Sequence, residues 1–260
     1  MVGGQRSRNL PGSLMEAKIT SYALQYAVYL LEGGLLCYLV FKSRSRRLTA
    51  LTLYVALLLV VDGITRPFVL YTEGLTSRAY WYTFWLTDVL LTLAAFILVC
   101  FFFRRACAQK ENIWRQLRMM LLFVFVLVVG ISSFSLFENY KQFLTSFVVE
   151  FEQNLYFTCL VLNTLLFVFM QQARSADDEL GLLVCGLGVQ FAGPAASLAL
   201  AHLTLDQVYS EGLVKLIMPL CTMGMLLTWL YAVARVPKRV EAFDLTVDVL
   251  SPVRVGAREV

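Results

Sequence analysis

Apolar residues in this chain gather in seven runs of roughly 20, separated by short stretches of charged or turn-forming residues. In an α-helix about 20 apolar residues cover the ~30 Å hydrocarbon core of a membrane. We therefore expect an all-α polytopic membrane protein, a bundle of seven transmembrane helices. The predicted spans are residues 20–41, 49–71, 80–103, 119–137, 147–170, 181–202 and 210–234.

These spans leave little of the chain for anything else. We expect a short extracytoplasmic segment at 1–19, a transmembrane domain at 20–235 and a short cytoplasmic tail at 236–260. Neither end is long enough to form a folded domain. A sensor built on such a chain needs a separate partner to carry its signal inward.

The composition agrees with lipid as the surrounding solvent. Hydrophobic residues make up 59% of the chain and charged residues 15%, whereas soluble domains average ~45–50% and ~25%. The net charge of +4 comes from basic residues placed between the apolar runs. This pattern is typical of orientation signals in a membrane protein and excludes nucleic acid as a partner.

Lysine and arginine are divided unequally between the two sets of predicted loops. One side holds five: Arg6, Arg8, Lys18, Arg78 and Lys141. The other side holds 13: Lys42, Arg44, Arg46, Arg47, Arg104, Arg105, Lys110, Arg115, Arg118, Arg174, Arg235, Lys238 and Arg239. The side richer in basic residues is normally cytoplasmic, so we expect the N-terminus outside and the C-terminus in the cytoplasm.

Several ionisable residues interrupt the apolar runs. At membrane depth such a residue costs several kcal/mol unless it is paired or faces a cavity, which makes it a candidate for function. Glu32, Asp88 and Glu150 have no opposite charge on their own predicted helix, and they lie at similar predicted depth. We predict that they converge, together with Tyr29 and Asn154, in an outward-facing polar pocket for a ligand or a proton.

Two other pairs of charges have the i, i+4 spacing that lets side chains meet on a helix. They are Asp62 with Arg66 and Glu211 with Lys215. We interpret both as structural ion pairs. For the polar positions as a whole two hypotheses stay open, a binding pocket and a network of interhelical hydrogen bonds without a ligand.

The sixth predicted helix carries two neighbouring rows of small residues. Such rows let helix backbones approach closely. The packing face that they predict is Gly188, Ala192, Ala196, Gly193 and Ser197. It serves either contacts within the chain or a homodimer or partner-subunit contact.

Catalytic signatures are not found. The single histidine, His202, cannot build a multi-histidine metal site, and the six cysteines show no C-x-x-C spacing. No G-x-S-x-G serine or phosphate-binding glycine loop is present. We therefore expect no enzyme activity, metal or other cofactor.

Four short segments carry a resemblance over most of the chain: Leu30 to Glu32, Arg66 to Tyr71, Tyr80 to Asp88 and Glu150 to Gln153. In these the chain resembles an uncharacterised group of bacterial seven-span membrane proteins. The resemblance implies the same fold and a bacterial inner (cytoplasmic) membrane, and it implies no reaction.

These observations lead to one main functional hypothesis and two alternatives. The main hypothesis is a non-enzymatic protein that acts as a sensor-like or accessory subunit of a membrane assembly, through the outward-facing pocket. The alternatives are a transporter for a small solute or proton, with Glu32 as its relay, and a purely structural subunit.

Overall fold

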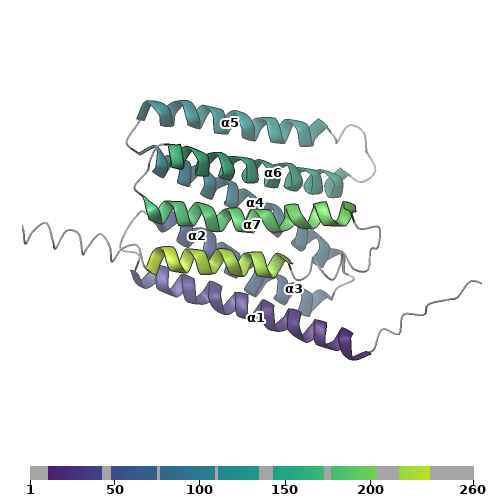
Figure 1. The fold of residues 1–260 in the computed structure, drawn as a ribbon. Helices are drawn as coiled ribbons and strands as arrows, with labels where there is room; N and C mark the ends of the chain where they lie inside the picture. The colour runs from purple at the N-terminus through teal and green to yellow at the C-terminus, as the bar shows by residue number, and fades with distance from the viewer. Residues whose placement is uncertain are drawn as a thin grey trace, which may run out of the picture.

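The computed structural model describes residues 11–42, 48–74, 77–108, 111–134, 143–172, 177–203 and 217–234. Helices account for nearly all of these residues, and no strand occurs among them, so the all-α prediction is confirmed for this part of the chain. Long helices lie side by side in one bundle, with α5 at its edge (Figure 1). Their bounds are α1 Pro11–Lys42, α2 Thr49–Leu58, η2 Leu59–Thr65, α3 Arg66–Glu73, α4 Arg78–Ala106, α5 Glu111–Phe134, α6 Phe143–Gln172 and α7 Asp178–Leu203, followed by a helix at 217–234.

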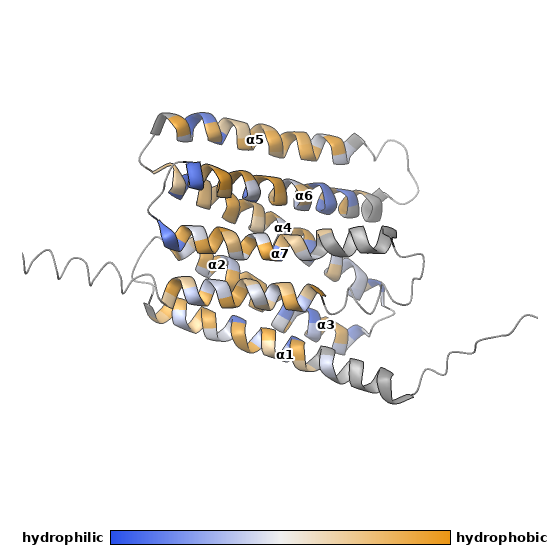
Figure 2. Ribbon diagram, in the orientation of Figure 1, coloured by the Kyte–Doolittle hydropathy of each residue, from blue (hydrophilic) through white to orange (hydrophobic). Residues whose placement is uncertain are grey.

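Six of these helical segments are long and apolar enough to cross a membrane: Ala23–Phe41, Thr49–Glu73, Arg78–Ala106, Ile113–Ser133, Glu150–Gln172 and Ile217–Ala234. The chain is accordingly an integral membrane protein. Hydrophobic residues dominate the middle of the helices, whereas hydrophilic ones appear near α3 and along the early part of α6 (Figure 2). Helix α7 lies beside these segments but is not among the six.

The helices extend further than the predicted spans. We predicted a loop at 104–118, but α4 continues to Ala106 and α5 already begins at Glu111. Arg104, Arg105, Arg115 and Arg118 therefore occupy helical turns rather than loop. The hydropathy pattern finds only the part of a helix that lies in hydrocarbon, because polar turns beyond it carry no apolar signal.

The second span contains a feature that the sequence pattern does not predict. Between α2 and α3 the helix widens into a π-helix, η2, in which the backbone N–H of Arg66 donates to Val61 O, five residues back. Pro67 follows at the start of α3. Since proline has no N–H to give to the preceding turn, a wider turn here accommodates it.

A tight turn joins α3 to α4. Gly74 has a φ of +77°, a conformation that favours glycine, and its N–H donates to Leu70 O at 3.1 Å. Ser77 then caps α4, because its hydroxyl accepts from the backbone N–H of Ala79 at 3.2 Å. The turn brings α3 back against the first half of α4.

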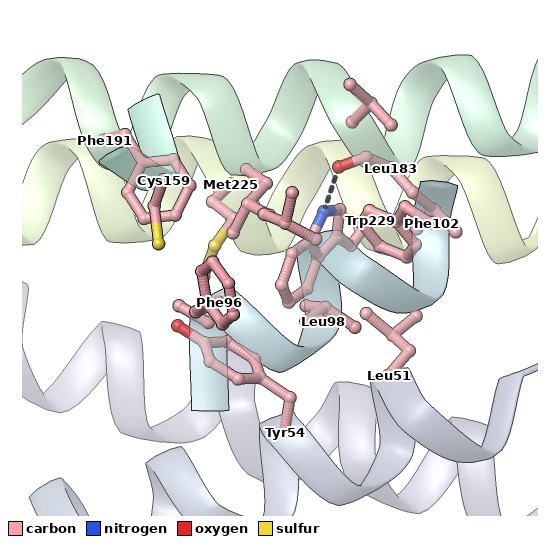
Figure 3. Close-up of a cluster of buried hydrophobic side chains, with 14 of the residues drawn as sticks. Leu51, Tyr54, Phe96, Leu98, Phe102, Cys159, Leu183, Phe191, Met225 and Trp229 are labelled. Carbon is pink, nitrogen blue, oxygen red and sulfur yellow. Dashed lines mark hydrogen bonds between the residues drawn. The ribbon is translucent and has the colours of Figure 1, made fainter. Parts of the chain in front are cut away.

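Apolar side chains fill the interior of the bundle, and Figure 3 shows a cluster of them. Trp229 is fully buried, packs edge to face with Tyr54, and donates from Nε1 to Leu183 O at 2.9 Å. Glycines on α7 permit this packing, since a Cβ at Gly186 would lie 2.8 Å from the Trp229 ring. The helix at 217–234 is thereby locked against α7 and α2.

Candidate functional site

Three charged side chains meet where η2 and α3 pack against α4. Arg66 reaches Asp62 through Nη1 at 2.8 Å and Asp88 through Nη2 at 2.6 Å. Its Nε donates to the Thr87 hydroxyl at 3.2 Å, and its guanidinium lies over the Phe84 ring, 4.5 Å from the centroid. We call Asp62, Arg66 and Asp88 the Arg66 triad.

Local structure places each member of the triad. Asp62 lies within the π-helix, one α-helical turn before Arg66. The turn at Gly74 sets α3 antiparallel to α4, so that Arg66 and Asp88 lie at comparable distances from it. Asp88 is about 15 Å along α4 from Arg78, at 1.5 Å per residue, which is well inside the apolar part of the helix. Its side chain is 29% exposed, that of Asp62 28% and that of Arg66 21%.

A fourth ionisable side chain approaches from α6. Glu152 lies close to Asp88, since α6 packs on α4, and both Asp88 and Arg66 act on it electrostatically. We predicted Glu150 for this position. It is partly buried and lies on the far side of α6, because two residues in an α-helix correspond to a rotation of about 200°.

The α6 face that carries Glu150 and Asn154 has another neighbour. Asn154 Nδ2 donates to the hydroxyl of Ser132 on α5 at 3.2 Å, and Ser132 is fully buried. Asn154 therefore links α6 to α5 and is not part of the Arg66 triad. In the described contacts the α6 residue beside Asp88 is Glu152, whereas Asn154 contacts α5.

Glu32 of α1 lies deeper in the bundle. Its side chain is fully buried, and neither carboxyl oxygen has a hydrogen-bond partner within the described part of the chain. Asp62 acts on it electrostatically from η2, against which α1 packs. Tyr29, one turn earlier, accepts a hydrogen bond from Gln25 at 2.8 Å and is influenced by Asp62, Glu32 and Arg66.

The structure thus gathers five ionisable groups from four parts of the chain, which we call the acidic cluster: Glu32, Asp62, Arg66, Asp88 and Glu152. Four of them are residues that the sequence predicts as pocket or ion-pair members, and Glu152 is not. A signal for Glu152 was present, since it shares a helical face with Tyr156 and Asn163. Both of these contact α7, through Gln190 O and Val184 O.

Two of the small residues of α7, Gly188 and Gly193, face other parts of the same chain. A Cβ on Gly188 would lie 3.0 Å from Asn163 Nδ2, and one on Gly193 would lie 2.8 Å from Cys221 Sγ. Ala192 is exposed. The side chains of Ala196 and Ser197 lie outside the described set, as do both members of the predicted pair Glu211 and Lys215.

A second group of charges lies at the opposite end of α4. Arg105 binds Asp177 with two hydrogen bonds, of 2.9 and 3.0 Å, and Glu179 with a third of 2.8 Å. Asp177 also accepts from the backbone N–H of Leu180 and so caps α7. The hydropathy pattern does not predict this contact, although an aspartate shortly before a predicted helix is a usual capping signal.

Comparison with known proteins does not assign this chain to a family. No protein-family model, curated protein or solved structure matches the chain.

Proposed function

We propose that this chain is a non-enzymatic, seven-span membrane protein that acts as a sensor-like or accessory subunit of a membrane assembly. The observation that carries the proposal is the position of the acidic cluster. Its charges lie at membrane depth toward the α3–α4 turn, and the bundle beyond Glu32 is filled with apolar side chains. A site of this kind receives a signal from one side of the membrane.

The orientation follows from the distribution of basic residues. With 13 lysines and arginines on one side and five on the other, the α3–α4 turn lies outside and the α4–α5 turn in the cytoplasm. In this arrangement α7 is the sixth span and the segment 217–234 the seventh. The resemblance noted in the sequence favours a bacterial cytoplasmic membrane.

The apolar core supports one-sided access. On the cytoplasmic side of Glu32, the fully buried residues of the described chain include Leu35, Leu39, Leu98, Leu183 and Trp229. Moving an ion through such a region is costly, since nothing there replaces its hydration. In this conformation the acidic cluster therefore communicates with the outside and not with the cytoplasm.

A second candidate function is transport of protons or a small solute. It is favoured by Glu32, which lies about 15 Å from the cytoplasmic end of α1 at 1.5 Å per residue, close to the middle of the membrane. Alternating access would require the apolar core around Trp229 to open. A flux measurement separates the two functions.

The test uses the full chain reconstituted into phospholipid vesicles that enclose a pH-sensitive dye. After an external pH step we expect the internal pH to change no faster than in protein-free vesicles. Proton flux well above that background, and lost in Glu32→Gln, would contradict the sensor function and support a transporter.

Access is measured on single cysteines in a background whose six native cysteines are replaced. Thr83, one turn before Thr87 on α4, is partly exposed, whereas Ala95 is buried on the same helix. We expect a membrane-impermeant thiol reagent to modify Thr83→Cys from outside and Ala95→Cys from neither side. Modification of Ala95→Cys from the cytoplasmic side would contradict one-sided access.

Orientation is tested in intact cells on the same background. Glu73→Cys should react before permeabilisation and Ala108→Cys only afterwards, since both positions are exposed. Native Cys107 is a poor reporter, because burial raises the pKa of its thiol and the thiolate is the reactive form. The reverse labelling order would invert the proposed topology.

A further inference from the structure

The acidic cluster contains more acid than base. Glu32, Asp62, Asp88 and Glu152 surround one cation, Arg66. With every group ionised, the cluster would carry three uncompensated negative charges. Unpaired charges at this depth are expensive, so something positive accompanies the cluster.

Glu32 limits what that positive species is. Its side chain has no exposed surface and its two oxygens have no hydrogen-bond donor among the described residues. A buried carboxylate needs a cation or several donors, whereas a neutral carboxylic acid needs far less. No group of three or more potential metal ligands occurs in the described chain.

Among the described residues, the surroundings of Glu32 supply no compensating charge. The titratable groups that interact with it are Asp62 from η2, Tyr54 from α2 and Tyr29 on its own helix, and none of these is a base. The neighbouring helix at 217–234 contains no lysine, arginine or histidine. A proton on Glu32 itself is the smallest cation that would neutralise this buried carboxylate.

The approach of Glu152 to Asp88 also favours a proton. Two ionised carboxylates repel each other and offer only hydrogen-bond acceptors, so a proton on one of them relieves the repulsion. The positive charge that faces these two carboxyl groups is that of Arg66, which binds Asp88. The charged residues of α5 and α7 lie near the opposite ends of those helices, at Glu111, Arg115, Arg118, Asp178 and Glu179.

We propose that protons from the outside are the ligand of the acidic cluster. One proton is carried by Glu32, and a second by Glu152 where it approaches Asp88. This inference rests on the proposed function, because it names the ligand of the same site. Asp62 stays ionised and, with Asp88, holds Arg66, which leaves one net negative charge instead of three.

Deprotonation then has a structural consequence. An ionised Glu32 would face Asp62 across the contact between α1 and η2, with no base between them in the described part of the chain. The two like charges repel, which favours separation of α1 from the π-helix. External pH is thereby coupled to the packing of the first two spans.

The test is infrared difference spectroscopy of the full chain in phospholipid vesicles, recorded between acidic and alkaline buffer. Protonated carboxylic acids give a C=O band distinct from that of carboxylates, so we expect loss of carboxylic-acid intensity as the external pH rises. Glu32→Gln and Glu152→Gln should each remove one component of this band. Glu150→Gln is the matched control and should leave both components unchanged.

A band unaffected by both Glu32→Gln and Glu152→Gln would overturn the inference. If a variant does not fold, the wild-type chain is treated with dicyclohexylcarbodiimide, an apolar reagent that adds to protonated carboxyl groups, and is mapped by mass spectrometry. An adduct on Glu32 that decreases with rising pH supports the inference. An unmodified Glu32, together with the absence of any carboxylic-acid band, contradicts it.

The dye-containing vesicles distinguish this inference from the proposed function. Both carboxylic-acid components together with rapid proton flux would refute the sensor and keep the proton sites. If the protein shows one-sided thiol access and no proton flux, but neither carboxylic-acid component appears, the proton sites are refuted and the sensor is kept.

Discussion

Two arginines in this protein each bind two carboxylates, yet they do so in different surroundings. Arg66 binds Asp62 and Asp88 at 2.8 and 2.6 Å. Arg105 binds Asp177 and Glu179 at 2.9 and 2.8 Å. By distance and partner type the two groups are nearly the same.

Their positions on the helices differ. Arg105 lies one residue before the end of α4, and its acidic partners precede or open α7. The positive end of the α7 dipole favours acidic residues there, and Asp177 caps the helix as well. The second negative charge is thus compensated, and a structural role accounts for every member of the group.

The Arg66 triad has no such compensation. It lies within apolar spans, where α2, η2 and α3 follow one another without a break, and Glu152 and Glu32 add further acid. The comparison teaches that an arginine–carboxylate contact alone does not indicate function. What distinguishes the Arg66 triad is acid that local structure leaves unbalanced.

The largest expected effect is from Arg66→Met, which strands Asp62 and Asp88 at membrane depth. Removing one partner of a buried ion pair commonly costs about 3–5 kcal/mol, and we expect a loss of that size. The measurement is the free energy of unfolding in mixed detergent micelles. Both arginines are compared under identical conditions.

The control for Arg66→Met removes the stranded charges as well. Combining it with Asp62→Asn and Asp88→Asn should restore much of the lost free energy, since no ion then remains unpaired. A triple variant no more stable than Arg66→Met would show that the three residues do not act as one ionic group.

The sequence could predict part of this arrangement, and the limit is physical. The contact between Asp62 and Arg66 is local, so i, i+4 spacing is enough to predict it. The contact with Asp88 depends on how α3 packs on α4, which the turn at Gly74 determines. Periodicity within one helix carries no information on that register.

Helical phase explains the exchange of Glu150 for Glu152. The segment from Glu150 to Asn154 is polar on several faces, so hydropathy alone does not reveal which side is buried. The π-helix was beyond sequence reasoning for a related reason. One extra residue in a turn changes the direction of every later side chain while leaving the apolar pattern almost unchanged.

The next effect separates the two carboxylates that hold Arg66. Asp62→Asn should cost about 1.5–3 kcal/mol, the usual contribution of a hydrogen bond to a charged group, because Asp88 still pairs with the arginine. Unfolding in detergent micelles again provides the value. A loss equal to that of Arg66→Met would mean that Asp88 does not share the ion pair.

A smaller loss is expected at the other arginine. Arg105→Met should cost about 1 kcal/mol, the upper end for accessible ion pairs, since Asp177 keeps its capping role and its side chain is 36% exposed. Added salt should reduce the difference from wild type, as screening weakens exposed pairs. A loss of the size expected for Arg66→Met, insensitive to salt, would remove the contrast between the two arginines.

The smallest effect provides the reference for a neutral polar contact. Asn154→Ala removes the 3.2 Å hydrogen bond to Ser132 on α5, and interhelical hydrogen bonds in membranes average about 0.6 kcal/mol. The double variant with Ser132→Ala should cost less than the two single losses added together, because the two residues share one bond. If Asn154→Ala instead destabilised the protein as much as Asp62→Asn, polarity at this depth rather than charge would explain both effects, and the acidic cluster would lose its distinction.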